Sequence, residues 1–478
     1  MKRALIFLAT SALPLSAQVR QTGYTAGALT PHQQLTREIY KQIIEINSGD
    51  KTGSVTPVAL ALAQRFRDAG IPDSDIFVGG PRPEKHNVVA RIHGRPGSTH
   101  KPLLLLAHID VVEALKADWS PEFDPFVFTE KDGYYYGRGT SDDKAMAAIF
   151  TANVFRLKRE GYVPDRDIII ALTADEEGGT ANGVEWLIKN HRDLVDAGIV
   201  LNEGGGGVTR NGKPFFNIVQ ATEKVFANIT LRVTNRGGHS SVPRADNAIT
   251  SLADALSKVG RYNFPVQFNE VTRAFFTRTA DVETPEMGRA MRALVANPKN
   301  AAAERIVSSD PRYNSTLRTT CVATLLRGGH AENALPQLAE ANVNCRMFPG
   351  DTPEGTRDAL ARVINDTTVH VIAAADDRPK EPPTPLLPEV MGPITRITHD
   401  MFGDIPVIPA MSTGATDSRY FRQLNVPAFG VSGLFADPTV DSRAHGRDER
   451  MRVQSFYEGQ EFLYRLTKAL TQSTIVTP

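Results

Sequence analysis

The sequence predicts an α/β protein in which a doubly wound, mostly parallel sheet forms the catalytic domain and carries an inserted ferredoxin-like α+β lid domain. Short apolar runs that end in acidic or imidazole side chains alternate with segments of helical periodicity, as in parallel strands joined by helices. Between residues 223 and 376 the order changes to strand, helix, two strands, helix and strand. That order is typical of a two-layer ferredoxin-like domain.

The elements of the catalytic domain follow from periodicity. Apolar residues at helical spacing predict helices at Leu35–Ile46 and Val55–Ala69, and a strand is predicted at Asn87–Ile92. Further strands are predicted at Leu103–Ala107, Ile168–Thr173 and Ile199–Leu201, and further helices at Lys144–Glu160 and Gly183–Asn190.

The lid has its own series of elements. Strands are predicted at Phe226–Val233, Thr319–Leu326, Ala341–Met347 and His370–Ala374, and helices at Asn247–Val259 and Pro353–Ile364. A largely helical insertion, Asn263–Asn314, is longer than such a connection needs, and the Pro-rich stretch Arg378–Pro388 marks the return crossing. The predicted order is a first catalytic part at 27–222, a lid at 223–376 containing the insertion 263–314, and a second catalytic part at 377–474.

Composition narrows the class of partner. The chain has 478 residues, 41% of them apolar, which suffices for a substantial core. Lys and Arg total 54, as do Asp and Glu, and no long run of either sign occurs. Neither nucleic acid nor a membrane is therefore an expected partner, and the substrate should be small.

The amino terminus predicts export. Lys2 and Arg3 precede the apolar run Ala4–Leu15, which meets small residues near Ala17, and we interpret residues 1–17 as a signal peptide. The run is too short to span a bilayer. The predicted location is periplasmic or secreted, and the rival interpretation is a short disordered tail.

Two cysteines occur, Cys321 and Cys345, both in predicted strands. If those strands form a hairpin the two positions can face each other, and export would permit a bridge. Two buried free thiols agree with the sequence equally well.

Charged side chains gather where the predicted strands end. His108 and Asp110 follow the first buried run, Glu176 and Glu177 follow the second, and Glu203 follows the third. Ligands of open α/β sheets collect outside the carboxyl ends of strands, so these side chains should converge. Any one of them alone could equally be an ordinary strand end or helix cap.

The charge at that convergence predicts a metal. With Asp142 added, five carboxylates would share one crevice with only two histidines, His108 and His445, and such a set cannot stay ionised without a cation. Imidazole and oxygen ligands without a thiolate suit zinc, with cobalt or manganese as alternatives. Three direct carboxylates against two divalent ions leave one positive charge, which a bridging hydroxide would cancel. That balance predicts a dinuclear hydrolase.

An ordered series of motifs resembles the M20 metallopeptidases over residues 35–466. The motifs are His108-Ile109-Asp110, Gly137-Arg138-Gly139-Thr140-Ser141-Asp142-Asp143-Lys144, Asp175-Glu176-Glu177-Gly178-Gly179, Glu203, Gly237-Gly238-His239-Ser240-Ser241 and Ala444-His445-Gly446. The family includes carboxypeptidases, dipeptidases and N-acyl amino acid hydrolases.

The resemblance implies a role for each metal ligand. Asp142 would bridge two divalent metal ions, His108 and Glu203 would complete one coordination shell, and Glu177 with His445 would complete the other.

Two further acidic residues have predicted roles beside these ligands. Asp110 is expected to hydrogen-bond the His108 imidazole and orient it. Glu176 is the predicted general base, with an extra metal ligand as its alternative role.

The resemblance also implies residues that act on the substrate. His239 would stabilise the oxyanion, often across a dimer, or is otherwise a polar loop residue. Asn333 and Arg346 would bind substrate polar groups and the free carboxylate, because a guanidinium pairs with a carboxylate through two hydrogen bonds; the alternative for Arg346 is a surface charge at a strand end. Gly414 would line the pocket with its backbone. A homodimer through the lid is expected, although the insertion departs from the short lid of simpler dimeric members.

The predicted function is that of an exported dinuclear zinc hydrolase that cleaves a peptide or amide bond beside a free carboxylate, as a carboxypeptidase or dipeptidase does. An N-acyl amino acid hydrolase is the alternative within the same class. From another class, the rival is a non-enzymatic envelope binding protein built on an inactive hydrolase. That rival is weakened because Glu176 is present and a suitable residue fills every predicted metal-ligand position.

Overall fold

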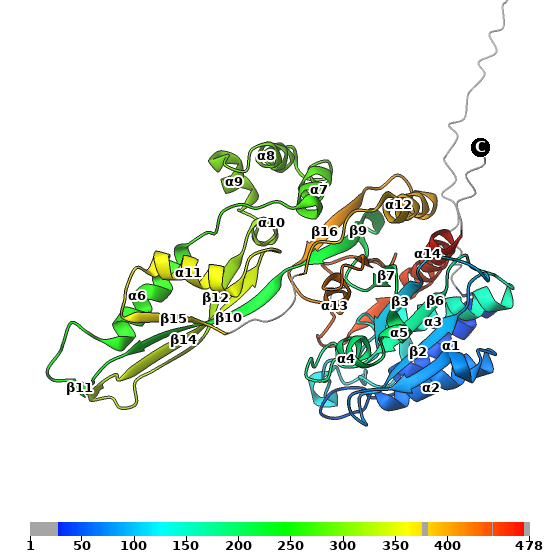
Figure 1. The fold of residues 1–478 in the computed structure, drawn as a ribbon, viewed down its shortest axis with the longest axis horizontal. Helices are drawn as coiled ribbons and strands as arrows, with labels where there is room; N and C mark the ends of the chain where they lie inside the picture. The colour runs from blue at the N-terminus through cyan, green and yellow to red at the C-terminus, as the bar shows by residue number, and fades with distance from the viewer. Residues whose placement is uncertain (1–26, 375–380, 442, 473–478) are drawn as a thin grey trace, which may run out of the picture.

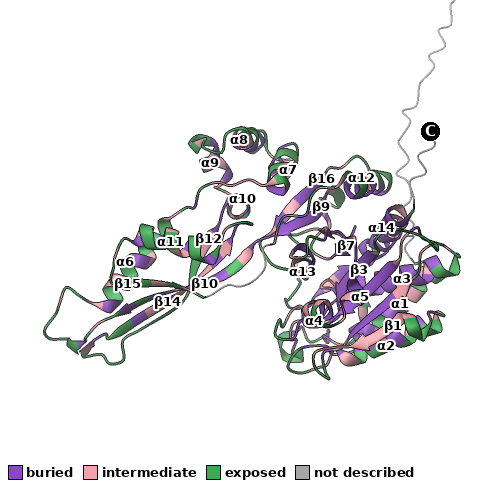
Figure 2. Cartoon of the chain, viewed as in Figure 1, coloured by how far each residue is buried: buried purple, intermediate pink, exposed green. Residues whose placement is uncertain are grey.

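The computed structural model describes residues 27–374, 381–441 and 443–472. The predicted signal peptide, part of the Pro-rich stretch and the last residues of the second catalytic part lie outside the described residues. The molecule is elongated, with the catalytic sheet at one end and the lid at the other (Figure 1). Buried residues gather in the central strands of the catalytic part, whereas the lid shows many exposed residues along its strands (Figure 2).

The main sheet is mostly parallel at its centre. Strand β3 (Leu103–His108) lies between β6 (Ile168–Thr173) and β7 (Ile199–Asn202), and both pairings are parallel. The full path is β1-β2-β6-β3-β7-β17-β9-β8-β18, with β16 beside β9. The outer strands are β1 (Ile76–Gly79), β2 (Asn87–Ile92), β8 (Gly207–Arg210), β9 (Lys213–Glu223), β16 (Val407–Ser412), β17 (Ala428–Gly430) and β18 (Phe435–Ala436). Three parallel carboxyl ends therefore meet at one edge.

Helices cover both faces of this sheet, as predicted. Leu103 and Leu105 of β3 belong to one core, and Leu104 and Leu106 belong to the core on the opposite face. The first core is formed with α1 (Pro31–Ile44), α2 (Thr56–Asp68), α3 (Lys144–Arg159), α12 (Pro388–Phe402) and α14 (Val453–Thr471), and the second with α4 (Gly183–Asn190), α5 (Arg192–Val195) and α13 (Ser418–Arg422). The alternation along β3 explains why that strand is an uninterrupted apolar run.

Helix α1 begins at Pro31, four residues before the predicted start at Leu35. Thr30 is its N-cap and forms a capping box with Gln33, whose side chain returns to the Thr30 backbone N–H. This motif satisfies two amide groups that a helix start otherwise leaves unpaired. The Thr-Pro-His-Gln sequence is the signal that would have placed the boundary correctly.

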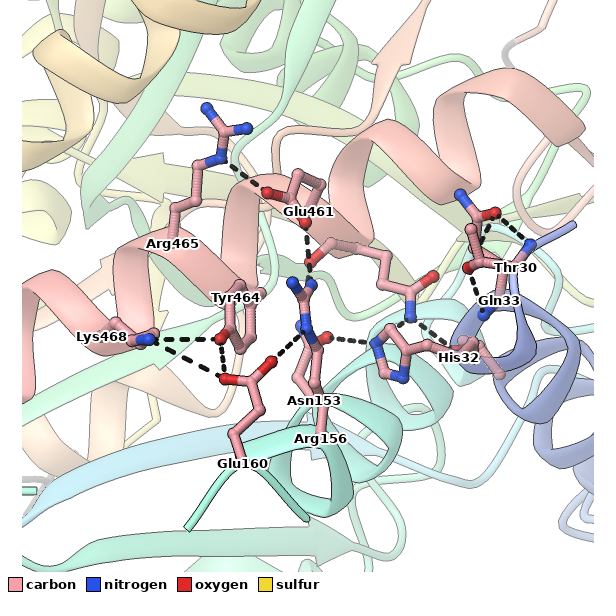
Figure 3. A network of polar contacts seen from close by, with 12 residues as sticks. Thr30, His32, Gln33, Asn153, Arg156, Glu160, Glu461, Tyr464, Arg465 and Lys468 are labelled. Carbon is pink, nitrogen blue, oxygen red and sulfur yellow. Dashed lines mark hydrogen bonds and ion pairs between the residues drawn. The ribbon is translucent and has the colours of Figure 1, made fainter. Parts of the chain in front are cut away.

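A polar network joins α1, α3 and α14 (Figure 3). His32 Nε2 lies 3.3 Å from Asn153 Oδ1, and Arg156 Nη1 donates to Glu461 at 2.9 Å. The Arg156 guanidinium also stacks over the Tyr464 ring at 3.5 Å. These contacts fix the terminal helix against the amino-terminal half of the catalytic domain.

The lid has the predicted ferredoxin-like topology. Its strands β10 (Val225–Thr234), β12 (Thr320–Gly328), β14 (Leu338–Met347) and β15 (Val369–Ala373) form an antiparallel sheet in the order β12-β14-β10-β15. Helices α6 (Ala248–Arg261) and α11 (Pro353–Ile364) pack on this sheet. A two-stranded ribbon of β11 (Gly238–His239) and β13 (Ala334–Leu335) extends from the far end of the lid (Figure 1).

The insertion is helical, as predicted, and it contacts both parts of the molecule. It contains α7 (Glu270–Thr279), α8 (Pro285–Ala296), α9 (Ala301–Val307) and α10 (Pro311–Leu317), which share a small apolar core. Arg278 Nη1 donates to the Val407 carbonyl of β16 at 2.6 Å, and Gln267 donates to Asp351 beside the lid sheet. The insertion therefore lies across the junction between lid and catalytic sheet.

Cys321 and Cys345 form a disulfide between directly opposed positions of β12 and β14. Of the two alternatives, a disulfide or two buried free thiols, the structure therefore contains the disulfide.

The glycine run after Glu203 packs closely against neighbouring backbone. A Cβ on Gly205 would lie 2.0 Å from the Gly430 carbonyl oxygen, so no larger residue fits there. Across the described ranges, no helix is both long and apolar enough to cross a membrane.

Candidate active site

The strand ends bring the predicted ligands together. His108 is the last residue of β3, Glu177 follows β6, and Glu203 directly follows β7. One side-chain atom from each of His108, Asp142 and Glu177 lies within 4.8 Å of the others, and the same holds for His108, Glu176 and Glu203. The adjacent parallel strands β6, β3 and β7 account for this convergence.

Asp142 lies between the two histidines. It belongs to the loop between β5 (Tyr134–Tyr136) and α3, and its Oδ1 is 2.9 Å from His108 Nε2. Its other oxygen, Oδ2, is 3.1 Å from His445 Nε2, which also lies 2.7 Å from Glu177 Oε1. Each carboxylate oxygen of Asp142 therefore faces a different imidazole.

These contacts shift the ionisation of both partners. Burial alone would raise the pKa of Asp142, but the hydrogen bonds from His108 and His445 hold that pKa well below its usual range. The contacts with Asp142 and Glu177 raise the pKa of His445 to about 10. The cluster thus favours charge on the oxygens that face the imidazoles.

Asp110 contacts both His108 and the turn that follows β6. Its Oδ1 is 3.4 Å from His108 Nδ1, and its two oxygens accept the backbone N–H groups of Glu176 at 3.2 Å and Glu177 at 3.0 Å. One carboxylate therefore lies beside the imidazole and holds the backbone of the acidic turn, while His108 Nδ1 also lies 3.2 Å from the Asp110 backbone carbonyl.

A buried lysine supports the same turn. Lys85 is 2% exposed, and its Nζ lies 2.7 Å from both Asp175 Oδ1 and Asp50 Oδ1. Asp175 has φ 64°, which places it in the left-handed region, where a non-glycine residue needs strong support from its surroundings. The Lys85 contact supplies part of that support.

Burial disfavours the charged form of two of the predicted site acids, Glu176 and Glu203. Burial raises the pKa of Glu176 to about 8. Burial, with the Asp142 charge as the next cause, raises the pKa of Glu203 well above its usual value. A carboxyl group with a pKa near neutrality can accept and return a proton.

Two functional residues were missed by the sequence predictions, Arg138 and Glu449. Glu449 Oε1 accepts the backbone N–H groups of Ser141 at 2.8 Å and Asp142 at 3.2 Å, and its Oε2 pairs with Arg138 at 2.7 Å. Arg138 also donates to the His445 carbonyl at 3.4 Å. The available signal was a charged residue inside one motif already singled out, Arg138, and a second charged residue, Glu449, three positions beyond the motif that ends at Gly446.

His239 and Asn333 are not brought to the ligand cluster of their own chain. His239 pairs with Ala334 in the β11–β13 ribbon, and the Asn333 carbonyl accepts the Ser240 N–H at 3.0 Å. Figure 1 places this ribbon at the end of the lid remote from β3, β6 and β7. Both side chains are exposed there.

Arg346 and Gly414 lie closer to the junction of the two parts. Arg346 is opposite Phe226 and Thr320 in the lid sheet, next to the point where β9 continues into β10, and its guanidinium lies 5.7 Å from the Phe226 ring centre. Gly414 follows β16, and its N–H donates to Ser412 Oγ at 3.0 Å.

The donor set fits a pair of divalent cations. Two imidazoles, a carboxylate with both oxygens engaged and three further carboxyl groups lie around one point, and that set contains no thiolate. Asp143 Oδ2 is buried nearby without a hydrogen-bond partner among the described residues. Oxygen and imidazole donors with uncompensated negative charge suit zinc, cobalt or manganese.

Comparison with known proteins identifies the family. Residues 104–469 match peptidase family M20/M25/M40. This chain belongs to that family. It is 30% identical over 396 residues to the human "N-fatty-acyl-amino acid synthase/hydrolase PM20D1", covering 80% of this chain and 76% of the relative. It is 32% identical over 382 residues to "Probable carboxypeptidase S-like 2" of Dictyostelium discoideum, covering 77% and 71%.

Solved structures show the same fold. The M20 family metallo-carboxypeptidase Sso-CP2 from Sulfolobus solfataricus matches with a TM-score of 0.66 at 19% identity, over 91% of this chain and 99% of that one. The Bacillus subtilis protein YXEP, described as a dinuclear metal binding peptidase from the M20 family, matches with a TM-score of 0.58 at 11% identity, over 92% and 98%. Membership makes this chain an M20 metallopeptidase or amidohydrolase, a hydrolase that acts on C–N bonds.

Proposed function

We propose that this protein is an exported dinuclear zinc hydrolase that cleaves the amide bond beside a free carboxylate. The observation that carries the proposal is Asp142, whose two oxygens face His108 and His445 at 2.9 and 3.1 Å within a group of further carboxyl side chains. His108 and Glu203 would hold one ion and Glu177 and His445 the other, with Asp142 shared. When bound, such a pair polarises a carbonyl oxygen and acidifies a water molecule.

The chain's own residues supply the proton transfer. Glu176 stands beside Glu203 and His108, and we assign it the role of taking a proton from the attacking water and passing it to the leaving amine. The Asp110 carboxylate accepts the Glu176 backbone N–H and lies beside the His108 ring, so it fixes the position of one relative to the other. A general base held in this way contributes through position as well as basicity.

Two features define the proposed substrate class: the amide bond that the hydrolase would cleave, and Arg346, which would pair with a carboxylate of the substrate. A guanidinium at the base of the lid suits the carboxylate of a small peptide or an N-acyl amino acid. Among the relatives, one name describes an N-fatty-acyl-amino acid synthase/hydrolase and another a probable carboxypeptidase. Both activities break an amide bond to an amino acid, and the first relative favours the N-acyl amino acid alternative alongside the peptidase.

The position of His239 supports a homodimer through the lid. Its ribbon extends away from the ligand cluster of the same chain (Figure 1), so an oxyanion contact from His239 requires a second copy. Asn333 lies beside it and would be delivered with it. Export is proposed on the residues at positions 1–17, because a basic start and a short apolar run are typical of a signal peptide.

One screen tests the proposal. Mature protein loaded with zinc, cobalt or manganese is incubated with dipeptides, N-acyl amino acids and the C-terminal amides of both. We expect hydrolysis of the free acids, with the amides far poorer substrates. Failure to cleave either class with any of the three metals would instead support the non-enzymatic binding protein.

A further inference from the structure

A cavity of about 530 Å³ lies between the helical insertion and the outer strands of the catalytic sheet. Its walls come from β8, β9 and β16, from the loop at Asp437, and from α7 and α10 of the insertion. Its volume falls in the range of sites that hold small organic ligands. None of the residues assigned above to metal, proton transfer or substrate lines it.

The floor of this cavity is apolar. Val208, Phe216 and Ile218 line it from the sheet, and Phe275 lines it from α7. Phe216 and Phe275 are only half-buried in the structure, so a hydrocarbon group placed against them would remove further apolar surface from water.

A polar atom in the wall also lacks a partner. Thr279 lines the cavity and is 5% exposed, yet its Oγ1 makes no hydrogen bond within the described part of the chain. A buried hydroxyl without a partner costs free energy, so this wall of the cavity is not fully satisfied by the protein alone.

The charged side chains around the cavity leave one cation without an acidic partner. Glu283 accepts the Tyr313 hydroxyl at 2.5 Å, and Asp437 accepts the Thr439 hydroxyl at 2.6 Å. Arg312 pairs with Asp310 at 2.8 Å. In contrast Arg210 stacks on Phe215 at 3.9 Å, and no described carboxylate pairs with it.

We propose that this cavity binds an apolar monocarboxylate, with its hydrocarbon body against Phe216, Ile218 and Phe275 and its carboxylate at Arg210. Glu283 and Asp437 accept hydroxyl hydrogen bonds within the wall and Arg312 is paired with Asp310. Arg210 is the wall cation that no described carboxylate pairs with, so its donors are the ones open to a carboxylate ligand. A guanidinium pairs with a carboxylate through two hydrogen bonds, which favours that head group over a neutral or cationic one.

The insertion makes the site possible. Phe275, Thr279 and Tyr313 all belong to α7 and α10, so a chain with a short connection in place of residues 263–314 would leave this face of β8 and β9 open. The site is independent of the proposed hydrolysis, because its residues take no part in the metal cluster. Binding at this cavity can therefore be confirmed or disproved whether or not the proposed hydrolysis is correct.

Calorimetric titration with decanoate, octanoate and decylamine tests the proposal on the mature, metal-loaded protein below the micellar concentration of each probe. We expect one saturable decanoate site per chain, affinity that falls roughly tenfold from decanoate to octanoate because two methylenes are lost, and much weaker binding of decylamine. Absence of saturable decanoate binding at millimolar concentration overturns the proposal.

Variants locate the site. Arg210→Gln should weaken decanoate at least tenfold and Arg210→Lys should restore part of the loss, whereas the exposed Arg289→Gln of α8 serves as a control and should change nothing. Val208→Trp should fill the cavity and abolish binding, with the melting temperature and hydrolytic activity showing that the fold is intact. If decanoate binding survives Arg210→Gln and Val208→Trp but is lost in Arg346→Ala, the ligand occupies the substrate site and the proposal is wrong.

Discussion

Arg138 and Glu449 form an ion pair of 2.7 Å in which both side chains are almost completely buried, 4% and 0% exposed. The pair connects two separate loops of the active site. Glu449 accepts the Asp142 N–H, and Arg138 donates to the His445 carbonyl. Asp142, the proposed bridging ligand, and His445, a proposed terminal ligand, are therefore positioned by one buried ion pair.

Glu449→Gln should weaken both the fold and the metal site. Removing one partner of a buried ion pair leaves an uncompensated charge and costs about 3–5 kcal/mol, and loss of a group that orients ligands lowers metal affinity roughly 10- to 100-fold. Denaturant unfolding and competitive zinc titration measure the two effects. Glu130→Gln is the matched control, because its pair with Arg37 is 2.8 Å long but exposed, and its loss should cost less than about 1 kcal/mol.

Asp142→Ala should remove both ions, because among the described residues only Asp142 has one oxygen facing His108 and the other facing His445. Elemental analysis of the mature protein should find close to two divalent ions in the wild type and neither tightly held in the variant. Asp118→Ala, at an exposed position, should retain both. Two tightly bound ions in Asp142→Ala would contradict the assignment of a shared ligand.

Glu176→Gln should keep the metal content and lose turnover. The amide has nearly the same shape as the carboxylic acid but cannot take up the proton, and loss of a positioned base lowers kcat by roughly 10²-fold or more. Elemental analysis and steady-state kinetics on the same preparation separate the two roles open to Glu176. A fall in metal content together with activity would make it a ligand, and near-normal turnover would place the base elsewhere.

Much of this arrangement could be predicted from the sequence because it rests on local patterns. The apolar runs before His108, Glu177 and Glu203 are buried parallel strands, and adjacent parallel strands bring their carboxyl ends together. The order of strands and helices in the lid could likewise be predicted, because segments of strand periodicity alternate with segments of helical periodicity. Those features depend on residues a few positions apart, where sequence carries its strongest signal.

The features that escaped prediction depend on contacts distant in sequence. Glu449 and Arg138 are charged residues whose burial is visible only once β19 (Arg450–Arg452) pairs with β5. Lys85 is likewise buried by its contacts with Asp50 and Asp175, which come from other segments. A lysine or glutamate in sequence is usually a surface residue, so nothing local marks these as structural.

Arg346→Ala should erase the preference for free acids over C-terminal amides. Arg346 is half-buried, so losing its pairing with a substrate carboxylate should cost about 2 kcal/mol, the low end for such pairs, which is roughly a 30-fold rise in KM. The control is Arg232→Ala, which removes an arginine of the same lid sheet that is paired with Glu340 at 2.6 Å. This variant should keep the preference for free acids. Equal wild-type rates on acids and amides would make Arg346 a strand-end charge and indicate an aminopeptidase-like enzyme.

His239→Ala should lower kcat by roughly 10²-fold and leave metal content and KM close to wild type, because an oxyanion donor acts mainly in the transition state. The remote position of His239 adds a sharper test. Mixing His239→Ala with Glu176→Gln under subunit exchange should restore activity, since one of the two shared sites in each mixed dimer contains both wild-type residues.

Subunit exchange must be shown directly, by mass measurement of mixed dimers under native conditions. Mixed dimers without recovered activity would mean that His239 does not act across the interface, and a strictly monomeric enzyme would remove its proposed role altogether. The ribbon that carries His239 lies at the end of the lid remote from the ligand cluster of its own chain (Figure 1), and a monomer that uses its own His239 would recover no activity on mixing. Recovered activity therefore requires delivery of this histidine by the second copy.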